Sequence, residues 1–256
     1  MFAIVLFAAN QSWSHIFECE FDYELLFDDL KVGYTCKVDK TEGREKRPTF
    51  FLTNKSHQTI ANVTAYNKHL DRNTNDDVTQ LYIMNQNMTY FPRGVTRFFH
   101  NIVAVHAGMN RLKFLEKDDL KEFTEMRFLY LYTNLLEVLQ SDVFQYTQAL
   151  EYVSFYNNRL MHIGSKILLP LVKLKTAYFN KNICIDKQAV SSEQGISEIR
   201  LEIAERCSDI TDEDLMNELK SNSDKIDKLE QKVSEVGKQL DMITEMMKTV
   251  MPKDKI

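Results

Sequence analysis

The chain has 256 residues, 44% of them hydrophobic, which is enough for one sizeable folded domain and an appendage. Its 32 Lys and Arg residues against 37 Asp and Glu residues give a formal net charge of −5, and the cations are scattered. This balance argues against nucleic acid or an anionic membrane surface as a partner.

Residues 1–14 are expected to be a secretory signal peptide. Residues 1–9 are almost wholly apolar, and Ser12 and Ser14 supply small residues for cleavage before His15. The segment is short and lacks a basic beginning, so a buried first strand is the alternative interpretation. No later stretch approaches the roughly 18 apolar residues of a membrane span. We therefore expect a mature protein that is secreted, extracellular and without a membrane span.

Four cysteines flank the most regular part of the chain, Cys19 and Cys36 near its beginning and Cys184 and Cys207 towards its end. Four cysteines allow three pairings, and the sequence alone does not choose among them. Their placement in a chain expected to be secreted favours two local disulfides over zinc, because CxxC spacing and flanking histidines are missing. The alternative is four buried thiols in a cytosolic protein.

A repeat of constant period occupies residues 78–184. Blocks of the form L-x-x-L-x-L-x-x-N-x-L begin at Val78, Ile102, Met126, Leu150 and Leu174, each 24 residues after the last. Each block supplies a short strand, a turn and a returning segment, which bury their apolar faces only against a neighbouring block. The sequence therefore predicts a solenoid of five stacked repeats.

Asparagine fills the polar turn position in the last four repeats, at Asn110, Asn134, Asn158 and Asn182. A turn that leaves the strand exposes backbone N–H and C=O groups inside the coil, and an amide side chain can satisfy both kinds. These residues are therefore expected to form a ladder through the stack, with ordinary exposed turn asparagines as the alternative. Gln86 takes the position in the first repeat, where a looser turn is expected.

The five blocks resemble the secreted, extracellular leucine-rich-repeat family, and the match over residues 78–184 is highly specific. The resemblance implies an α/β solenoid shaped as a horseshoe, with short parallel strands. It also implies an N-terminal cap over residues 15–77 and a C-terminal cap over residues 185–209, closed by the cysteine pairs, because solenoid ends expose strand edges and apolar cross-sections. Caps of the family commonly carry four cysteines, whereas two are present at each end here.

Three N-x-S/T patterns mark candidate glycosylation sites, beginning at Asn54, Asn62 and Asn87. The first two lie in the expected N-terminal cap, where a strand is predicted near Thr59 to Tyr66. They are the favoured acceptors if the chain is secreted. Asn87 lies beside a buried template position in the first repeat turn, and lower accessibility is expected there.

Residues 210–256 change to charged helix formers with a heptad pattern. The a positions are Leu219, Ile226, Val233, Leu240 and Met247, and the d positions are Leu215, Leu229, Val236, Ile243 and Val250. The pattern predicts a helical coiled-coil tail that needs a partner helix, although Asn222 at a d position and Gly237 in mid-helix weaken it. Another copy, another chain and the flank of the solenoid are the candidate partners, and the sequence does not separate them.

No motif indicates catalysis, a metal or a cofactor. The six histidines form no H-E-x-x-H or other metal spacing, and no G-x-S-x-G, P-loop or Rossmann glycine pattern occurs. His106 lies on a predicted strand face without a neighbouring nucleophile or carboxylate, so a contact residue is the preferred interpretation. We expect a protein that is not an enzyme.

The candidate binding surface follows from the strand register, because side chains that flank the template apolar positions point away from the core. Across the five strands they form three rows rich in aromatics and without formal charge, a composition typical of a protein-recognition core. The alternative is that aromatics simply favour strands and cross-strand pairing. The predicted partner-binding residues are Tyr82, His106, Phe128, Tyr130, Tyr132, Tyr152, Tyr156 and Tyr178.

Extracellular recognition of a protein partner is the leading functional hypothesis. The order of signal, solenoid, cysteine-closed cap and coiled-coil tail resembles secreted insect immune proteins that hold complement-like factors in the haemolymph, which implies an innate-immune role. The alternatives are a structural or matrix-adhesion protein, and an intracellular repeat scaffold with free thiols if residues 1–14 are retained.

Overall fold

The computed structural model describes residues 16–25, 32–38, 52, 58–65, 67–208, 232–233, 236–237 and 239–240. The chain divides into two compact units, Met1–Asp209 and Ile210–Ile256. The expected signal peptide at residues 1–14 and the candidate acceptor Asn54 lie outside the described residues, and both stay predictions.

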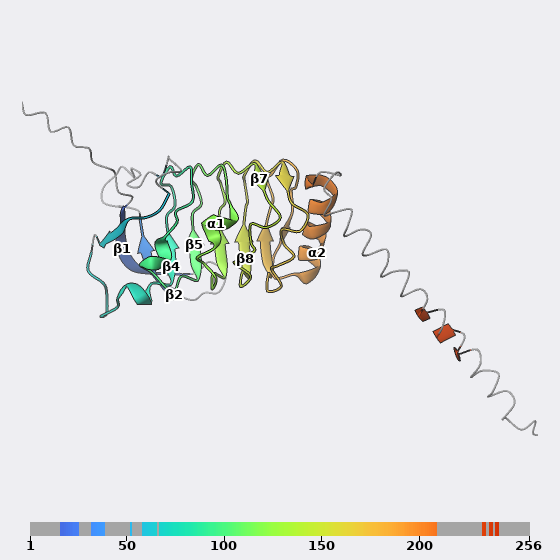
Figure 1. Ribbon diagram of the computed structural model, residues 1–256, viewed down its shortest axis with the longest axis horizontal. Coiled ribbons are helices and arrows are strands. Elements are labelled where there is room, and N and C mark those ends of the chain that lie inside the picture. Colours follow the sequence, from blue (N-terminus) through green and yellow to red (C-terminus); the bar gives the residue numbers. More distant parts are fainter. Residues whose placement is uncertain are drawn as a thin grey trace, which may run out of the picture. The chain divides into compact units, whose positions relative to one another are not determined.

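Five short parallel strands, one from each repeat, form the centre of the first unit (Figure 1). They are β4 (Gln80–Tyr82), β5 (Ala104–His106), β6 (Phe128–Tyr130), β8 (Tyr152–Ser154) and β10 (Thr176–Tyr178). Neighbouring strands pair without a register shift, so that Val105 lies between Leu81 and Leu129. Equivalent positions of successive repeats therefore stack on one another, which makes this unit a solenoid.

An N-terminal hairpin extends the sheet to nine strands. β1 (Ile16–Leu25) and β2 (Val32–Lys37) are antiparallel, and β2 lies parallel to β4. β3 (Asn62–Ala65) pairs in parallel with β1, within the range where the sequence predicts a strand. The disulfide Cys19–Cys36 joins β1 to β2, and both cysteines are fully buried. The hairpin therefore places its cross-link inside the core that it shares with the first repeat.

A strand and a helix close the other end of the stack. β11 (Gln188–Ala189) runs antiparallel to β10, and α2 (Glu193–Glu202) continues into a π-helical turn, Ile203–Cys207. The Ser192 side chain caps α2 by accepting a hydrogen bond from the Gly195 N–H at 3.0 Å. The helix buries its apolar stripe, Ile196, Ile199 and Ile203, in the common core.

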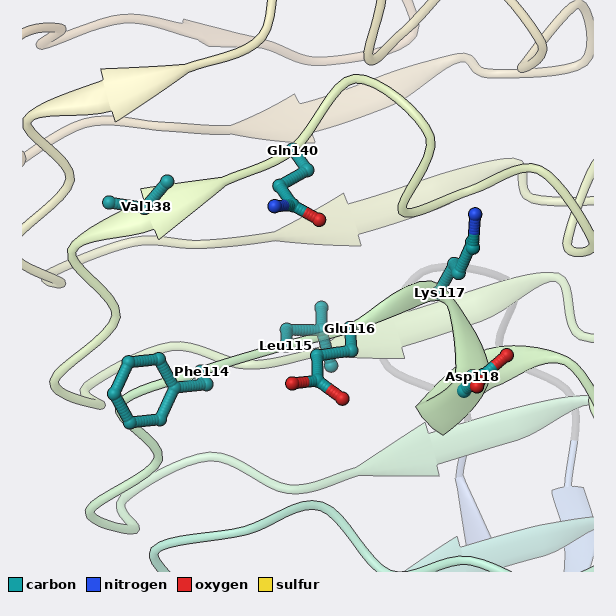
Figure 2. Close-up of a pocket in the computed structure, with 7 residues that line it drawn as sticks. All are labelled: Phe114, Leu115, Glu116, Lys117, Asp118, Val138 and Gln140. Carbon is teal, nitrogen blue, oxygen red and sulfur yellow. The ribbon is translucent and has the colours of Figure 1, made fainter.

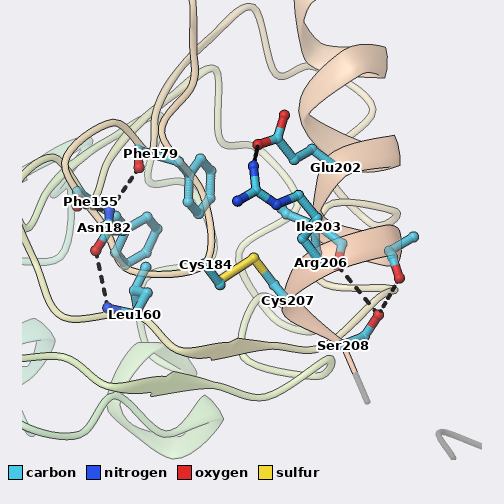
Figure 3. Close-up of a disulfide and its surroundings, with 11 residues drawn as sticks. Phe155, Leu160, Phe179, Asn182, Cys184, Glu202, Ile203, Arg206, Cys207 and Ser208 are labelled. Carbon is cyan, nitrogen blue, oxygen red and sulfur yellow. Dashed lines mark hydrogen bonds and ion pairs between the residues drawn. A yellow bond between two sulfur atoms is a disulfide. The ribbon is translucent and has the colours of Figure 1, made fainter. Parts of the chain in front are cut away.

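The second disulfide, Cys184–Cys207, ties the π-helical turn to the last repeat (Figure 3). The Cys184 N–H donates to the Leu160 carbonyl at 2.9 Å, which continues the stacking of one repeat on the next. Arg206 and Glu202, one turn apart on the helix, form an ion pair at 2.9 Å. Both disulfides follow the local pairing that the sequence favours.

The remaining short elements connect the strands around one apolar core. They are 3-10 turns at Asn75–Asp77 and Val95–Arg97, the helix α1 (Lys117–Leu120), and the strands β7 (Val138–Leu139) and β9 (His162–Ile163), which form a separate two-stranded parallel sheet. The 24-residue period holds in these connections too, since Phe91, Leu115, Leu139 and Ile163 are all buried. The core is therefore continuous along the stack.

The turn asparagines form the predicted ladder of hydrogen bonds. Asn134 Nδ2 donates to the carbonyls of Ala107 at 3.1 Å and Leu131 at 3.0 Å, and its Oδ1 accepts from the Leu112 N–H at 3.0 Å. Equivalent bonds are made by Asn110, Asn158 and Asn182. Each amide therefore satisfies backbone groups of its own repeat and of the repeat before it.

The hydrogen bonds of Gln86 within the described residues differ from those of the ladder asparagines. Its side-chain Nε2 donates to the Met84 carbonyl of its own turn at 2.9 Å, while its backbone N–H is bound by Asn110 Oδ1 at 2.8 Å. Gln86 is buried, so the longer amide is folded back within the first turn. Asn110 of the second repeat therefore contributes to holding this turn.

A left-handed residue precedes the ladder position in every repeat. The φ angle is 55° at Asn85, 54° at Met109, 53° at Thr133, 56° at Asn157 and 58° at Lys181. None of these residues is glycine, and a β-branched residue such as Thr133 rarely adopts this conformation. The same backbone bend therefore turns the chain out of each strand whatever the side chain.

The second unit is described at only six positions, 232–233, 236–237 and 239–240, all of them helical. Val233, Val236 and Leu240, which occupy heptad core positions, are exposed there. The coiled coil stays a prediction. Over the described residues, no helix has the length and apolar character needed to cross a bilayer.

Candidate functional site

The five parallel strands carry a second face on the side away from the solenoid core. Residues that alternate with the buried Leu81, Val105 and Leu129 project from it. We call its aromatic part the aromatic face, defined as Tyr82, His106, Phe128, Tyr130, Tyr132, Tyr152, Tyr156 and Tyr178. The structure places all of these predicted residues on the central strands or directly after them.

Rings of the aromatic face contact one another across all five strands. The centroids of His106 and Tyr130 are 4.1 Å apart with the rings nearly parallel, at 9°. Tyr82 stacks on the other side of His106 at 5.5 Å. Tyr152 continues the chain of rings, at 4.6 Å from Tyr130 and 5.7 Å from Tyr178. These five rings of the face therefore form one connected aromatic layer.

The centre of the aromatic face is buried. Phe128 and Tyr130 are each 2% exposed and Tyr152 is 8% exposed, and with Ala104 they form an apolar cluster separate from the main core. Tyr82, Tyr132, Tyr156 and Tyr178 are half-buried. The accessible part of the face therefore consists of these four tyrosines. Tyr132 and Tyr178 pack against the central cluster, and Tyr82 stacks on His106.

His106 is the only ionisable imidazole in this layer, and it is 1% exposed. Burial disfavours the charged ring and lowers the pKa of His106 to about 4. The imidazole is therefore neutral at physiological pH, and it belongs to the layer as a flat ring between Tyr82 and Tyr130.

Tyr132 crosses the layer to reach an earlier repeat. Its hydroxyl lies 3.4 Å from the sulfur of Met84, two repeats away. The ring passes over Gly108, where an added Cβ would lie 2.8 Å from the Tyr132 Cζ. Burial raises the pKa of the Tyr132 hydroxyl, which keeps it protonated and available as a donor.

Cations border the aromatic face, although the three predicted rows contain none. Lys37 Nζ lies 5.4 Å from the ring centre of Tyr82, and Lys181 Nζ lies 5.0 Å from that of Tyr156. The Arg127 guanidinium lies 5.2 Å from the ring centre of Phe128. All three distances fit cation–π contacts. Arg127 and Lys181 lie just outside the rows, and Lys37 comes from the hairpin, so the strand pattern did not include them.

A charged row lies at the start of the strands, again with the repeat period. Glu151 accepts from Arg127 Nε at 2.6 Å and from Lys175 Nζ at 2.7 Å. The hydrogen bond from Arg127, together with that from Lys175, lowers the pKa of Glu151 to about 2. The carboxylate therefore neutralises part of the positive border next to Phe128 and Tyr152.

A second candidate surface is a pocket of about 280 Å³ beside β7 (Figure 2). Phe114 and Val138 line it and are 56% and 46% exposed. Two of its charged side chains have partners within the chain, because Lys117 pairs with Asp142 and Glu116 with Arg93. Two exposed apolar side chains here stand among charged residues, whereas the aromatic face spans five strands, and we regard the pocket as the weaker candidate.

The two candidate glycosylation residues within the described chain are both exposed. Asn62 lies in β3, and Asn87 lies in the first repeat turn with a φ of 54°. The expectation of lower accessibility at Asn87 is wrong, because the left-handed turn directs this residue outward while Met88 enters the core.

No model of a known protein family and no curated relative matches the sequence. Among solved structures, a chain of the Toll–Spatzle complex, "a molecular hub in Drosophila development and innate immunity", is 16% identical with a TM-score of 0.40, over 48% of this chain and 17% of that chain. Its glycosylated form gives 21% identity and a TM-score of 0.39, over 42% and 14%.

A chain of the LRIM1/APL1C complex is 15% identical with a TM-score of 0.41, over 62% of this chain and 31% of that chain. The present chain therefore spans less than one third of the length of each of these three structural neighbours.

Proposed function

We propose that this protein is a non-catalytic, extracellular recognition module that binds a protein partner on the aromatic face. The observation that carries the proposal is the connected layer of rings across five parallel strands, on the face away from the core. The leucine-rich-repeat resemblance implies that this is the concave side of a horseshoe. A large uncharged surface of this kind suits a protein better than a small polar ligand.

The arrangement of buried and half-buried rings supports tight recognition. Tyr130 and Tyr152 hold the layer rigid, so that the accessible rings lose little conformational freedom when a partner binds. Tyrosines present both an apolar ring and a hydroxyl, which explains their frequency among residues that dominate binding energy. Tyr132 and Tyr156 occupy neighbouring repeats and are the central accessible pair.

An extracellular location is supported by the two disulfides, because such bonds persist in oxidising compartments and are rare in the cytosol. The signal-like segment, residues 1–14, agrees with this location. Mass spectrometry of the native protein tests it. We expect a chain that begins near His15 with four oxidised cysteines, and an intact first residue with four free thiols would instead identify an intracellular scaffold.

The binding site is tested by substituting accessible rings of the aromatic face. Partner proteins are first identified by cross-linking to the tagged full-length chain in its native fluid. Each partner is then purified, and the Kd of its complex with the full-length chain is measured. Tyr132→Ala with Tyr156→Ala should weaken binding by about 2 kcal/mol or more, which is roughly thirtyfold or more in Kd. Tyr130 and Tyr152 are less suitable probes, because their burial means that truncation also opens a cavity.

The matched control removes exposed apolar side chains elsewhere, with Phe114→Ala and Val138→Ala in the pocket beside β7. This control should leave Kd unchanged. If the control weakened binding while the aromatic-face variant did not, the pocket would be the binding site. If the aromatic-face variant lost an adhesion phenotype but still bound its partners from the native fluid, the structural role would be favoured over innate-immune recognition. The innate-immune role rests on the order of elements in the sequence.

The tail is proposed as a second association surface through its heptad seam. Val233 and Val236 are exposed on helical segments, in keeping with a seam that awaits a partner helix. Leu229→Lys with Val236→Lys should lower the mass measured by sedimentation without changing the thermal stability of the first unit. If wild type and variant were both monomeric, self-association through the tail would be excluded, and a different chain would be the expected partner.

A further inference from the structure

The nine-stranded sheet ends at β3, and no other described strand pairs with its outer side. An edge strand is in general a template for another strand, because its outward backbone groups have no partner strand, although at β3 the Val63 N–H is bound by the Asn62 side chain. Beyond β3 the side chain of Asn67 continues the contact with β1, because it binds both backbone groups of Phe21, at 2.7 Å and 2.9 Å. What remains open is Asn62–Ala65, which carries no charge.

Asn62 lies at this edge, and the oxygen and nitrogen of its side-chain amide have different surroundings. Its Oδ1 accepts a hydrogen bond from the Val63 N–H at 2.9 Å, while its Nδ2 makes no hydrogen bond with the described residues. Asn62 and Thr64 are exposed on the same side of the strand, whereas Val63 between them packs against the core. Both residues of the glycosylation pattern are therefore exposed in the folded edge, and the Thr64 hydroxyl also donates to the Phe17 carbonyl at 3.5 Å.

We propose that Asn62 carries an N-linked oligosaccharide that covers the β3 edge and prevents it from pairing with the β3 edge of a second copy. The inference rests on the extracellular location proposed above. A glycan on Nδ2 leaves Oδ1 free to keep its bond to the Val63 N–H. Its bulk at the edge excludes a neighbouring strand, as charged residues and proline do in other proteins.

The modification is a glycosyl transfer from a lipid pyrophosphate-linked oligosaccharide. The bond between the sugar C1 and the pyrophosphate oxygen breaks, and its electron pair leaves with the lipid pyrophosphate. A bond forms between C1 and Asn62 Nδ2, and the nitrogen releases one proton to a base of the cellular transferase. No oxidant or reductant takes part.

A second copy is the partner that an uncovered β3 edge would find first, since it presents the same strand at the same concentration. Two β3 strands can pair antiparallel about a two-fold axis, the commonest symmetry of protein dimers. The segment Asn62–Ala65 contains Val63 and Thr64, which favour strands, and no proline to block the pairing.

Three substitutions of Thr64 distinguish the effect of losing the glycan from the effect of changing the Thr64 side chain itself. Thr64→Ser keeps the acceptor pattern, Thr64→Val removes it with a side chain of the same shape, and Thr64→Lys removes it but adds a charge that blunts the edge. Each full chain is produced through the secretory pathway. Occupancy of Asn62 is measured by peptide mass after glycosidase treatment, and molecular mass by light scattering.

We expect a glycan on Asn62 in wild type and in Thr64→Ser, with equal molecular masses. Thr64→Val should lose the glycan and double its polypeptide mass, and Asn62→Gln should do the same. Thr64→Lys should lose the glycan and keep the parental mass. Asn87→Gln, which removes the pattern in the repeat turn, should also keep the parental mass, because Asn87 is not at a sheet edge.

Three results would overturn the proposal. An unmodified Asn62 in the secreted protein would exclude the glycan, and an unchanged mass in Thr64→Val would exclude its protective role. Association of Thr64→Lys equal to that of Thr64→Val would exclude edge pairing. A chain that is not exported would overturn this inference together with the extracellular location, but loss of the glycan alone would leave the aromatic face as the proposed binding site.

Discussion

Gly108 lies directly beneath the ring of Tyr132, and a Cβ at Gly108 would come within 2.8 Å of the Tyr132 Cζ. Because Gly108 has no side chain, the Tyr132 ring of the next repeat can lie over it. Because Tyr132 reaches Met84 across this gap, three repeats share one contact.

Gly108→Ala should displace the Tyr132 ring and weaken partner binding by about tenfold, or about 1.4 kcal/mol. The free energy of unfolding should fall by less than about 1.5 kcal/mol, because the clash is with the far end of a movable side chain. Gly164→Ala is the comparison, since its Cβ would lie 2.5 Å from the Ser141 backbone nitrogen. It should destabilise the fold more. Unchanged Kd in Gly108→Ala would show that Tyr132 does not touch the partner.

Asn134→Ala or Asn158→Ala should lower the free energy of unfolding by about 1–3 kcal/mol, because interior backbone groups lose their partners. Urea unfolding measures the effect. Asn157→Gly is the control, since this exposed neighbour has a φ of 56° that glycine adopts without strain. Asn157→Ala would itself introduce strain and is unsuitable. Equal losses at Asn157→Gly and Asn158→Ala would contradict the ladder.

Cys207→Ser should lower the free energy of unfolding by about 2–4 kcal/mol through loss of the bond to Cys184. The free Cys184 is replaced by serine in a second variant, so that mispairing does not confuse the result. A melting temperature equal to that of wild type in both variants would show that α2 stays docked without its cross-link.

The stability of the protein should decrease in acid through His106. The pKa of His106 is lowered from 6.5 to about 4, so between these values the unfolded chain binds a proton that the folded chain does not. The contribution of His106 to the free energy of unfolding is therefore fully present above pH 6.5. It falls by up to about 3 kcal/mol as the pH drops towards 4. His106→Phe, which keeps a flat ring, should remove this dependence in urea unfolding between pH 7 and pH 4.

Glu151 provides a second and more acidic window. Its pKa is lowered from 4.5 to about 2, so its stabilising contribution is present above pH 4.5 and is lost as the pH falls through about 2. Glu151→Gln should reduce the loss of stability between pH 4.5 and about 2, and it should leave the window of His106, from pH 6.5 to about 4, intact. Removal of both windows by Glu151→Gln would assign the whole acid dependence to the charged row.

The strands and the ladder could be predicted from the sequence because both depend on the repeat alone. Once Val78 and Ile102 set the register, the places of Tyr130 and Asn134 follow from counting. The hairpin of β1 and β2 was not predicted, since the terminal segments do not share the period and their pairing depends on the first repeat.

Burial within the aromatic face could not be predicted either. The register shows that Tyr130 and Tyr152 leave the core, but not that their rings lie 4.6 Å apart and cover one another. The cation from the hairpin, Lys37, reaches Tyr82 only because β2 pairs with β4. Lateral contacts between side chains are set by shape and rotamer, which a periodic pattern does not contain.

The asparagine ladder also constrains which deletions the stack of repeats can accept. Each amide serves the repeat before it, as Asn110 does for Gln86 and Asn134 does for Leu112. Removal of residues 127–150 would join two equivalent positions, and Asn158 would meet the backbone that Asn134 now binds. A deletion of another length that replaces Asn134 would bring a different residue to the ladder position. Engineered variants that remove a whole ladder step should therefore keep the fold when they lose 24 residues.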